Sequence, residues 1–227
     1  MLAIIPARGG SKGLPGKNVK LFDGIPLICV TIQEAMKSKR ISKVIVSTDD
    51  EEIAKAAKSC GGYIPFMRPI ELASDKSAAI DTFFYTVDKL NEEFNEKYED
   101  IIILFPTAPL RTAMHIDEAI DLFYEKKADS VISVSESLTP IEWTRKINEN
   151  GKLIQYFEGG NKNRQDYDIT YIPNGLLYIF NVEKLRETRN YYMENTYPYI
   201  IDKKYYGDID DADDFKITEY KYINNKK

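Results

Sequence analysis

Short apolar stretches alternate with amphipathic stretches along most of this chain. Apolar runs that favour buried strands occur at residues 2–5, 43–47, 63–66, 101–105, 130–134 and 175–180. Apolar positions with helical spacing, or helix-starting polar clusters, predict helices at 26–39, 51–60, 77–92, 114–126 and 211–222. Strands and helices that alternate in this way predict an α/β fold with a doubly wound, mostly parallel sheet.

The alternation stops between residues 138 and 172, which form a polar stretch too long to be a plain connection in a compact domain. One interpretation is a floppy insertion. The other is an arm that packs on a second subunit, for which Trp143, Tyr156 and Phe157 would supply apolar area. We therefore expect a core made of residues 1–137 and 173–227, with a small dimerisation arm at 138–172.

The first predicted strand leads directly into a loop rich in glycine and in basic residues. Its members are Arg8, Gly9, Gly10, Ser11, Lys12, Gly13, Gly16 and Lys17. Glycine lets backbone N–H groups turn towards an anion, and three fixed positive charges favour a polyanion such as a triphosphate. The spacing fits neither the Walker A loop nor the dinucleotide-binding fingerprint. A surface turn with incidental lysines is the alternative, but the position after the first strand of an α/β pattern favours phosphate binding.

Composition excludes several classes of protein. The 227 residues can bury one full core, and 43% hydrophobic with 30% charged residues is ordinary for a soluble globular protein. A net charge of −5 argues against broad nucleic-acid binding. No apolar run is long enough to span a membrane, and Met1 leads directly into strand residues, so we expect a cytoplasmic protein without membrane association.

The cysteines and the histidine offer no metal site. Cys29 and Cys60 show no ligand-type spacing, and each falls in a predicted helix or at its end, so we expect reduced thiols. The single histidine, His115, stands at a predicted helix start. We expect a capping or solvated role for it.

A pair of carboxylates near the C-terminus could bind a cation. Asp208 and Asp210 stand two positions apart, so in an extended segment both side chains point to the same side. Two carboxylates together with phosphate oxygens are a usual environment for Mg²⁺. Alternatively, Asp210 or Asp211 caps the last predicted helix, and both interpretations can hold at once.

Several motifs occur in a fixed order along the chain. They are Ala-Arg-Gly-Gly-Ser-Lys-Gly-Leu-Pro-Gly-Lys-Asn from Ala7, Ser47-Thr48-Asp49, Arg68-Pro69 with Leu72-Ala73-Ser74-Asp75, Pro-Thr-Ala-Pro-Leu-Arg-Thr from Pro106, Arg164-Gln165, Pro173-Asn174-Gly175 and Asp208-Ile209-Asp210. This ordered set resembles the N-acylneuraminate cytidylyltransferases, or CMP-sialic acid synthetases, including relatives that activate legionaminic and pseudaminic acids. The resemblance covers essentially the whole chain.

The resemblance implies a Rossmann-like nucleotidyltransferase fold that transfers CMP from CTP to the anomeric hydroxyl of a nonulosonic acid, with release of pyrophosphate. Arg8 and Lys17 would be catalytic, and Asp208 and Asp210 would bind Mg²⁺. The nucleotide would be held by Ala7, Gly9, Gly10, Ser11, Lys12, Asn18 and Arg68. Residues facing the sugar would be Phe105, Arg164, Gln165 and Asn174. The arm would form a homodimer and bring residues of one subunit to the sugar site of the other.

Two positions depart from the members that use sialic acid. Phe105 stands where they usually carry Gln, and Ile172 stands where they tend to carry Arg. An unpaired buried polar group costs about 1–3 kcal/mol, so the same sugar could not be held in the same way. We expect both apolar residues to border the sugar pocket and to favour a nine-carbon acid that ends in a methyl group, such as legionaminic or pseudaminic acid.

Other functions remain open at this point. The same fold could transfer another nucleotide, or act on another sugar acid or a sugar phosphate. The chain could also be a non-catalytic nucleotide-binding regulatory module or a dimerising scaffold. Intact Lys17, Asp208 and Asp210 count against lost turnover, and a scaffold leaves the basic glycine loop unexplained.

Overall fold

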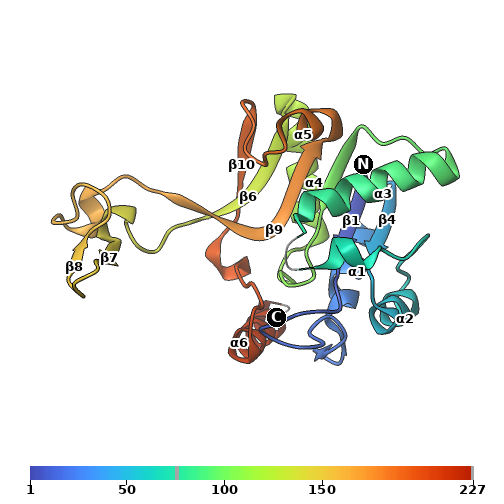
Figure 1. Ribbon diagram of the computed structural model, residues 1–227, viewed down its shortest axis with the longest axis horizontal. Coiled ribbons are helices and arrows are strands. Elements are labelled where there is room, and N and C mark those ends of the chain that lie inside the picture. Colours follow the sequence, from blue (N-terminus) through green and yellow to red (C-terminus); the bar gives the residue numbers. More distant parts are fainter. Residues whose placement is uncertain (75–76, 226–227) are drawn as a thin grey trace.

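The computed structural model describes residues 1–74 and 77–225, and its centre is a six-stranded sheet (Figure 1). The strand order is β10-β6-β9-β5-β1-β4. The strands are β1 (Leu2–Pro6), β4 (Lys43–Ser47), β5 (Asp100–Ile103), β6 (Ser130–Glu136), β9 (Tyr171–Asn181) and β10 (Thr196–Ile200). The β1–β4, β1–β5 and β10–β6 pairs are parallel, whereas β9 runs antiparallel to both β5 and β6. The predicted mostly parallel sheet is confirmed.

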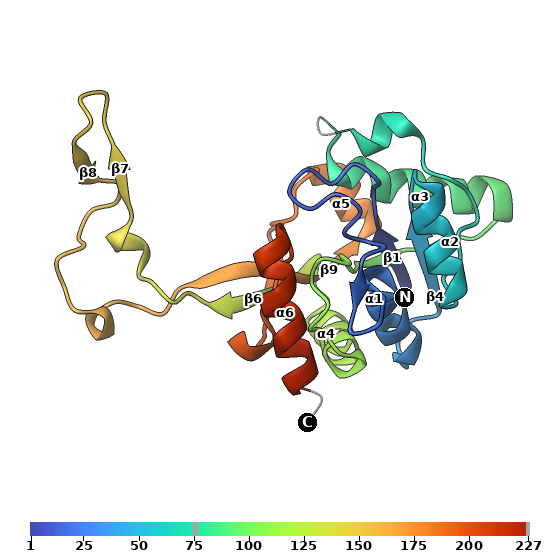
Figure 2. The ribbon, with the colours of Figure 1, turned by 90° about the horizontal axis from the view of Figure 1, so that it is seen from below.

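Helices cover both faces of this sheet (Figures 1 and 2). Along β1, Ala3 and Ile5 pack in one cluster with α1, α2 and α4, while Leu2 and Ile4 pack in another with α3 and α5. Successive residues of a strand point to opposite faces, so these two clusters lie on opposite sides. The helices are α1 (Leu27–Lys37), α2 (Glu51–Ser59), α3 (Ala79–Phe94), α4 (Ala113–Lys126), α5 (Val182–Thr188) and α6 (Ala212–Asn225). The doubly wound α/β arrangement is therefore confirmed.

Four parts of the core differ from the prediction. The strand expected at 63–66 is a single bridge between Ile45 and Tyr63. Strand β10 and the short helix α5 were not predicted. A small antiparallel pair, β2 (Leu21–Phe22) and β3 (Ile25–Pro26), closes the opening loop before α1.

Among the helices of the described residues, none has the length and apolar character needed to cross a membrane.

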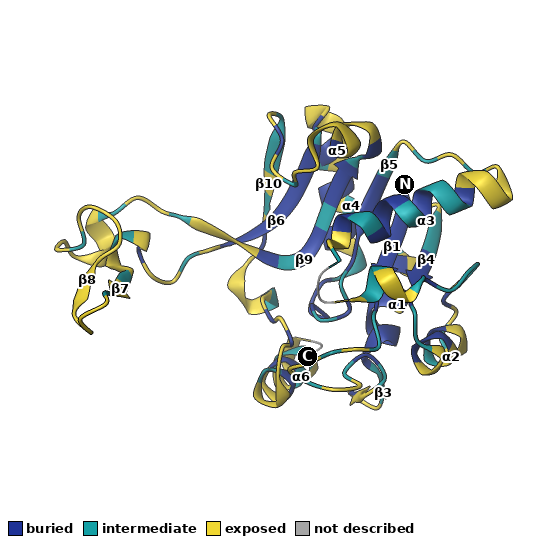
Figure 3. Cartoon of the chain, viewed as in Figure 1, coloured by how far each residue is buried: buried dark blue, intermediate teal, exposed yellow. Residues whose placement is uncertain are grey.

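The segment between β6 and β9 leaves the core. The two strands continue outward as a ribbon that pairs Val134 with Pro173 and Glu136 with Tyr171. Beyond it lies a separate hairpin of β7 (Arg145–Ile147) and β8 (Leu153–Gln155), which projects away from the sheet (Figures 1 and 2). Most of this projection is exposed, including its large apolar side chains (Figure 3).

The structure shows the pairing of the two cysteines and the surroundings of the histidine. Cys29 in α1 and Cys60 at the C-terminal end of α2 form a disulfide, with their Cα atoms 5.7 Å apart. The prediction of reduced thiols is wrong, because two packed helices bring together cysteines 31 residues apart, and spacing along the chain does not reveal this contact.

The capping role of His115 is confirmed. Its Nδ1 accepts a hydrogen bond from Thr112 N, and Thr112 Oγ1 accepts one from His115 N.

Candidate active site

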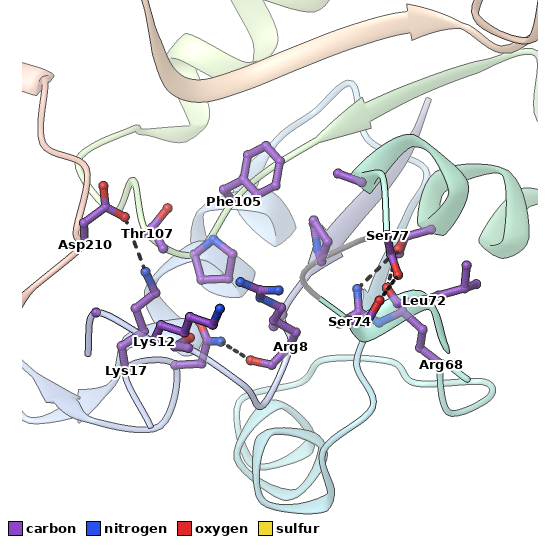
Figure 4. A pocket seen from close by; sticks show the side chains of 18 residues that line it. Arg8, Lys12, Lys17, Arg68, Leu72, Ser74, Ser77, Phe105, Thr107 and Asp210 are labelled. Carbon is purple, nitrogen blue, oxygen red and sulfur yellow. Dashed lines mark hydrogen bonds and ion pairs between the residues drawn. The ribbon is translucent and has the colours of Figure 1, made fainter. Parts of the chain in front are cut away.

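A cavity of about 650 Å³ lies at the carboxyl ends of β1 and β5 (Figure 4). Arg8, Lys12 and Lys17 form one wall, and the loop after β5 lies above them. Leu72, Ser74 and Ser77, together with the first turn of α3, close the other side. Nine of the predicted site residues line the cavity: Ala7, Arg8, Ser11, Lys12, Lys17, Asn18, Arg68, Phe105 and Asp210. Residues from both halves of the sequence therefore meet at this edge of the sheet, as the strand order requires.

The two ends of the opening loop are joined by a hydrogen bond from the Asn18 side chain to the backbone. The buried side chain of Asn18 donates from Nδ2 to Arg8 O (3.2 Å), and Asn18 O accepts from Ile28 N (3.0 Å). At the entrance of the loop, Ala7 N continues the β1–β4 ladder by donating to Ser47 O (2.9 Å). Asn18 therefore joins the two ends of the loop, and the loop between them places Arg8 and Lys12 on the cavity wall.

Asp49, which the sequence analysis assigned no role, connects this loop to Arg68. A single carboxylate oxygen, Oδ1, accepts from Gly9 N (3.2 Å) and from Arg68 Nη2 (3.0 Å). Burial lowers the pKa of the Arg68 guanidinium, and the hydrogen bond from Asp49 opposes that shift. Asp75, part of the same motif as Arg68, lies outside the described residues.

Lys17 and Gly13 dock the opening loop onto the segment that carries the two carboxylates. Lys17 Nζ donates to Ile209 O (2.7 Å) and lies 3.8 Å from Asp210 Oδ1. A Cβ added to Gly13 would lie 2.3 Å from Asp210 O, so only glycine permits this approach. Gly10, by contrast, has open space around it. The first and last functional motifs of the chain are thus in direct contact.

The carboxylate pair is held by the loop after β5. Ile209 N donates to Thr107 O (2.9 Å), and the Thr107 side chain hydrogen-bonds the Asp208 carboxylate. Burial raises the pKa of Asp208, the Thr107 hydrogen bond opposes the shift, and the nearby charge of Asp210 adds to it.

The cap of α6 is provided by another residue. Asp211 Oδ1 accepts from Asp213 N (2.8 Å) and Asp214 N (2.9 Å). The carboxylates of Asp208 and Asp210 are therefore not needed for capping. Within the described residues, His, Cys, Asp and Glu form no metal-binding group of three or more. A cation here would rest on these two carboxylates and on oxygens of the substrate, which suits Mg²⁺.

The residues predicted to face the sugar are divided among three places. The ring of Phe105 lines the cavity and contacts Tyr178 edge to face, with 5.9 Å between ring centroids. Arg164 and Gln165 lie in a short 3₁₀ helix between β8 and β9, exposed and outside the cavity. Ile172 is 43% exposed on the outward ribbon. The expectation that it borders the pocket opposite Phe105 is wrong for this subunit, because β9 leaves the core at that position.

Asn174 lies inside the sheet. Its Oδ1 is 2.6 Å from Ser133 Oγ, and its Nδ2 donates to Ser135 Oγ (2.9 Å). It stands in an irregularity of the β6–β9 pairing, where the residues from Asn174 to Leu177 face a single position of β6. Its amide therefore supports the shape of β9 beside the cavity.

Comparison with known sequences identifies the family. The sequence profile of a protein family described as "Cytidylyltransferase" matches residues 2–216. The chain belongs to the cytidylyltransferase family. The family expected from the ordered motifs is thereby confirmed.

Two relatives of this cytidylyltransferase are 34% identical to it. One is the N-acylneuraminate cytidylyltransferase of Escherichia coli O18:K1:H7, where the match covers 96% of this chain and 51% of the relative. The other is the CMP-N,N'-diacetyllegionaminic acid synthase of Legionella pneumophila, where it covers 96% and 94%. The chain thus spans about half the length of the first relative and nearly all of the second.

A solved structure confirms the fold of this cytidylyltransferase. It is a CMP:2-keto-3-deoxy-manno-octonic acid synthetase complexed with CTP, 14% identical in sequence, with a TM-score of 0.73 over 99% of this chain and 98% of that one. The Rossmann-like nucleotidyltransferase fold is therefore shared despite low sequence identity.

Proposed function

We propose that this cytidylyltransferase transfers CMP from CTP to the anomeric hydroxyl of a nonulosonic sugar acid and releases pyrophosphate. The observation that carries the proposal is the contact of Lys17 with Ile209 and Asp210, which joins the basic glycine loop to the segment of the two carboxylates, with Lys17 and Asp210 both lining the cavity. The names of the two 34% identical relatives support a sialic-acid-like acceptor. CTP as substrate suits a cytoplasmic reaction.

In this proposal the opening loop binds the triphosphate. The backbone N–H of Gly10 and the side chains of Ser11 and Lys12 would bind the phosphates, while Arg8 and Lys17 would neutralise the charge that grows at the α-phosphate and the leaving pyrophosphate. The N–H groups of Gly9 and Ser11 donate to Asp49 Oδ1 and Gly9 O in this structure, so they would join only by releasing those acceptors. The anomeric oxygen attacks the α-phosphorus in line. A new O–P bond forms, the bond from the α-phosphorus to the bridging oxygen breaks, and the hydroxyl proton is released. The protein acts by positioning and by stabilising charge.

Asp208 and Asp210 would hold Mg²⁺ beside the triphosphate. The cation supplies charge neutralisation of the phosphate oxygens when it is bound. The donor set fits, because both carboxylates are free of capping duties and Asp208 is fixed by Thr107. Lys17 holds the backbone of this segment, so it also sets the distance between the loop and the carboxylates.

The sugar would lie against Phe105, whose ring offers an apolar surface to a methyl or acyl group. Arg164 and Gln165 lie on the projecting arm, so they would reach a sugar only in the cavity of a second subunit. We therefore include a homodimer in the proposal, with residues 138–172 as the dimerisation arm. Asn174 would contact the sugar only by exchanging a serine partner for the ligand.

A pyrophosphate-release assay tests this function. The purified protein is incubated with each of the four ribonucleoside triphosphates and a panel of nonulosonic acids, other sugar acids and sugar phosphates. We expect release with CTP and a nonulosonic acid. Release only with another nucleotide or a sugar phosphate would contradict the proposal, and nucleotide binding without release would indicate a regulatory module.

A further inference from the structure

A positively charged side chain is buried between two strands beside the cavity. Arg111 is 1% exposed, and its hydrogen bonds go to uncharged oxygens: Leu176 O (2.5 Å), Thr31 Oγ1 (2.5 Å) and Phe105 O (2.8 Å). Burial lowers its pKa to about 9, and its Nε–H has no acceptor. The charge of Glu34 opposes this shift of the pKa, but the hydrogen bonds named above all go to neutral acceptors. A buried cation held in this way is costly, so the fold must offset that cost elsewhere.

The place of Arg111 follows from the strand register. The antiparallel pairing of β5 with β9 ends at Ile103 opposite Tyr178. Continued by two residues, the same register would place Phe105 opposite Leu176. Instead, the carbonyl groups of these two residues both accept hydrogen bonds from Arg111. The guanidinium therefore replaces direct pairing and holds the ends of the two strands apart.

On the β9 side, the irregularity at Asn174–Leu177 presents this carbonyl. Gly175 has a φ of +73°, and a Cβ added there would lie 3.6 Å from Asp208 Oδ2. Leu176 N donates to Asn174 Oδ1 (3.2 Å), and Leu176 O accepts from Arg111 Nη1. The separated end of β9 thus faces one member of the carboxylate pair.

On the β5 side, the effect reaches the cavity through three consecutive residues. Phe105, Pro106 and Thr107 all line the cavity, and Arg111 fixes the first of them by its carbonyl group. Thr107 in turn holds Ile209 N and the Asp208 carboxylate. The buried guanidinium is therefore connected to the proposed cation site by its hydrogen bond to Phe105 O, the backbone from Phe105 to Thr107, and the hydrogen bonds of Thr107.

We propose that Arg111 is a positioning residue whose guanidinium holds the ends of β5 and β9 apart and, through Phe105 and Thr107, sets the geometry of the Asp208–Asp210 segment. Only a planar group with several fixed donors reaches acceptors on two strands and on α1 at once, so lysine cannot replace it. The activity readouts of this inference rest on the proposed function.

The test compares Arg111→Lys with Arg40→Lys, a matched control at an exposed arginine that pairs with Asp121. For Arg111→Lys we expect kcat to fall by at least about 10-fold, because misplaced groups slow transfer, and the Mg²⁺ concentration for half-maximal rate to rise. Amide hydrogen exchange of residues 104–109 and 207–210 should accelerate, while the control matches the wild type. A folded Arg111→Lys with unchanged kcat, Mg²⁺ requirement and exchange would overturn the inference.

Two further variants keep the inference testable if Arg111→Lys does not fold. Thr31→Val removes one acceptor and leaves the guanidinium, so the same readouts should shift in the same direction by a smaller amount. Thr107→Val removes the side-chain hydrogen bond to Asp208, keeps the carbonyl that accepts from Ile209 N, and should also raise the Mg²⁺ requirement. Its effect and that of Thr31→Val should be less than additive when combined. Unchanged readouts in Thr31→Val, or full additivity, would overturn the inference.

Hydrogen exchange separates this inference from the proposed function. If the wild-type protein releases no pyrophosphate with CTP and any sugar acid, the proposed function fails, yet exchange in the variants still reports whether Arg111 fixes the two segments.

Discussion

Replacing Gly13 by alanine should lower the activity of the site, although glycine itself contributes no side chain to it. The added Cβ would lie 2.3 Å from Asp210 O and 3.3 Å from Asp210 C, and the first distance is far inside normal contact. Relieving the clash requires the loop and the Asp210 segment to separate by roughly 1 Å, and overpacking of this kind costs about 1–3 kcal/mol. Because Lys17 Nζ lies only 2.7 Å from Ile209 O, the separation also moves Lys17 relative to the carboxylates.

A displacement of about 1 Å in a catalytic arrangement can cost about 10²-fold in rate, so we expect kcat of Gly13→Ala to fall by about 10–10²-fold. Arg40→Lys is the control, since this exposed side chain pairs with Asp121 and does not line the cavity. Its unfolding free energy should stay within about 0.5 kcal/mol of the wild type and its rate within about twofold. Both variants are assayed by pyrophosphate release and thermal unfolding. Wild-type kcat in Gly13→Ala would refute the reasoning.

Four more predictions follow from the site. Lys17→Ala should lower kcat by on the order of 10²-fold beyond any change in KM, because the charge it contacts grows in the transition state; an unaltered kcat would remove Lys17 from catalysis. The raised pKa of Asp208 means that protons compete with Mg²⁺ as the pH falls towards that pKa, so the acid limb of kcat/KM should move to lower pH as Mg²⁺ is increased. An acid limb that ignores Mg²⁺ would contradict that assignment. Phe105→Gln should reduce the preference for methyl-ended acids over N-acetylneuraminic acid, measured by competition at equal concentration, within the roughly 10–200-fold range of one apolar contact; a wild type that prefers N-acetylneuraminic acid would defeat the idea. Ile147→Asp with Leu153→Asp, at the exposed apolar tip of the arm, should convert a dimer to a monomer in sedimentation analysis, and an unchanged mass would exclude the arm as the interface.

The core could be predicted from sequence where the pattern is local and strong. The buried run at β1, the run at β4 and the helix α4 appear within a residue or two of their expected bounds. The cavity position also followed, because the opening loop leaves the carboxyl end of β1. In contrast, β10 has the sequence Thr-Tyr-Pro-Tyr-Ile, and the proline and half-exposed tyrosines hide its strand character.

The connections within the site could not be predicted, because they join residues far apart in the chain. Arg111 reaches Leu176, 65 positions away, and Lys17 reaches Ile209, 192 positions away. Neither contact has a periodicity or spacing that a sequence pattern could show. The same is true of Cys29 and Cys60, which only the packing of α1 on α2 brings together. Ile172 was misplaced because the length of β9 beyond the core was not apparent from its composition.

The most direct test of the central claim is identification of the product by ³¹P NMR. The purified protein is mixed with CTP, Mg²⁺ and the acid that gives the fastest pyrophosphate release. The account predicts a new phosphodiester resonance for a CMP-sugar that grows in step with an equimolar amount of pyrophosphate, persists in Arg40→Lys and is strongly slowed in Lys17→Ala. Release of pyrophosphate with free CMP and no phosphodiester at any time would contradict it.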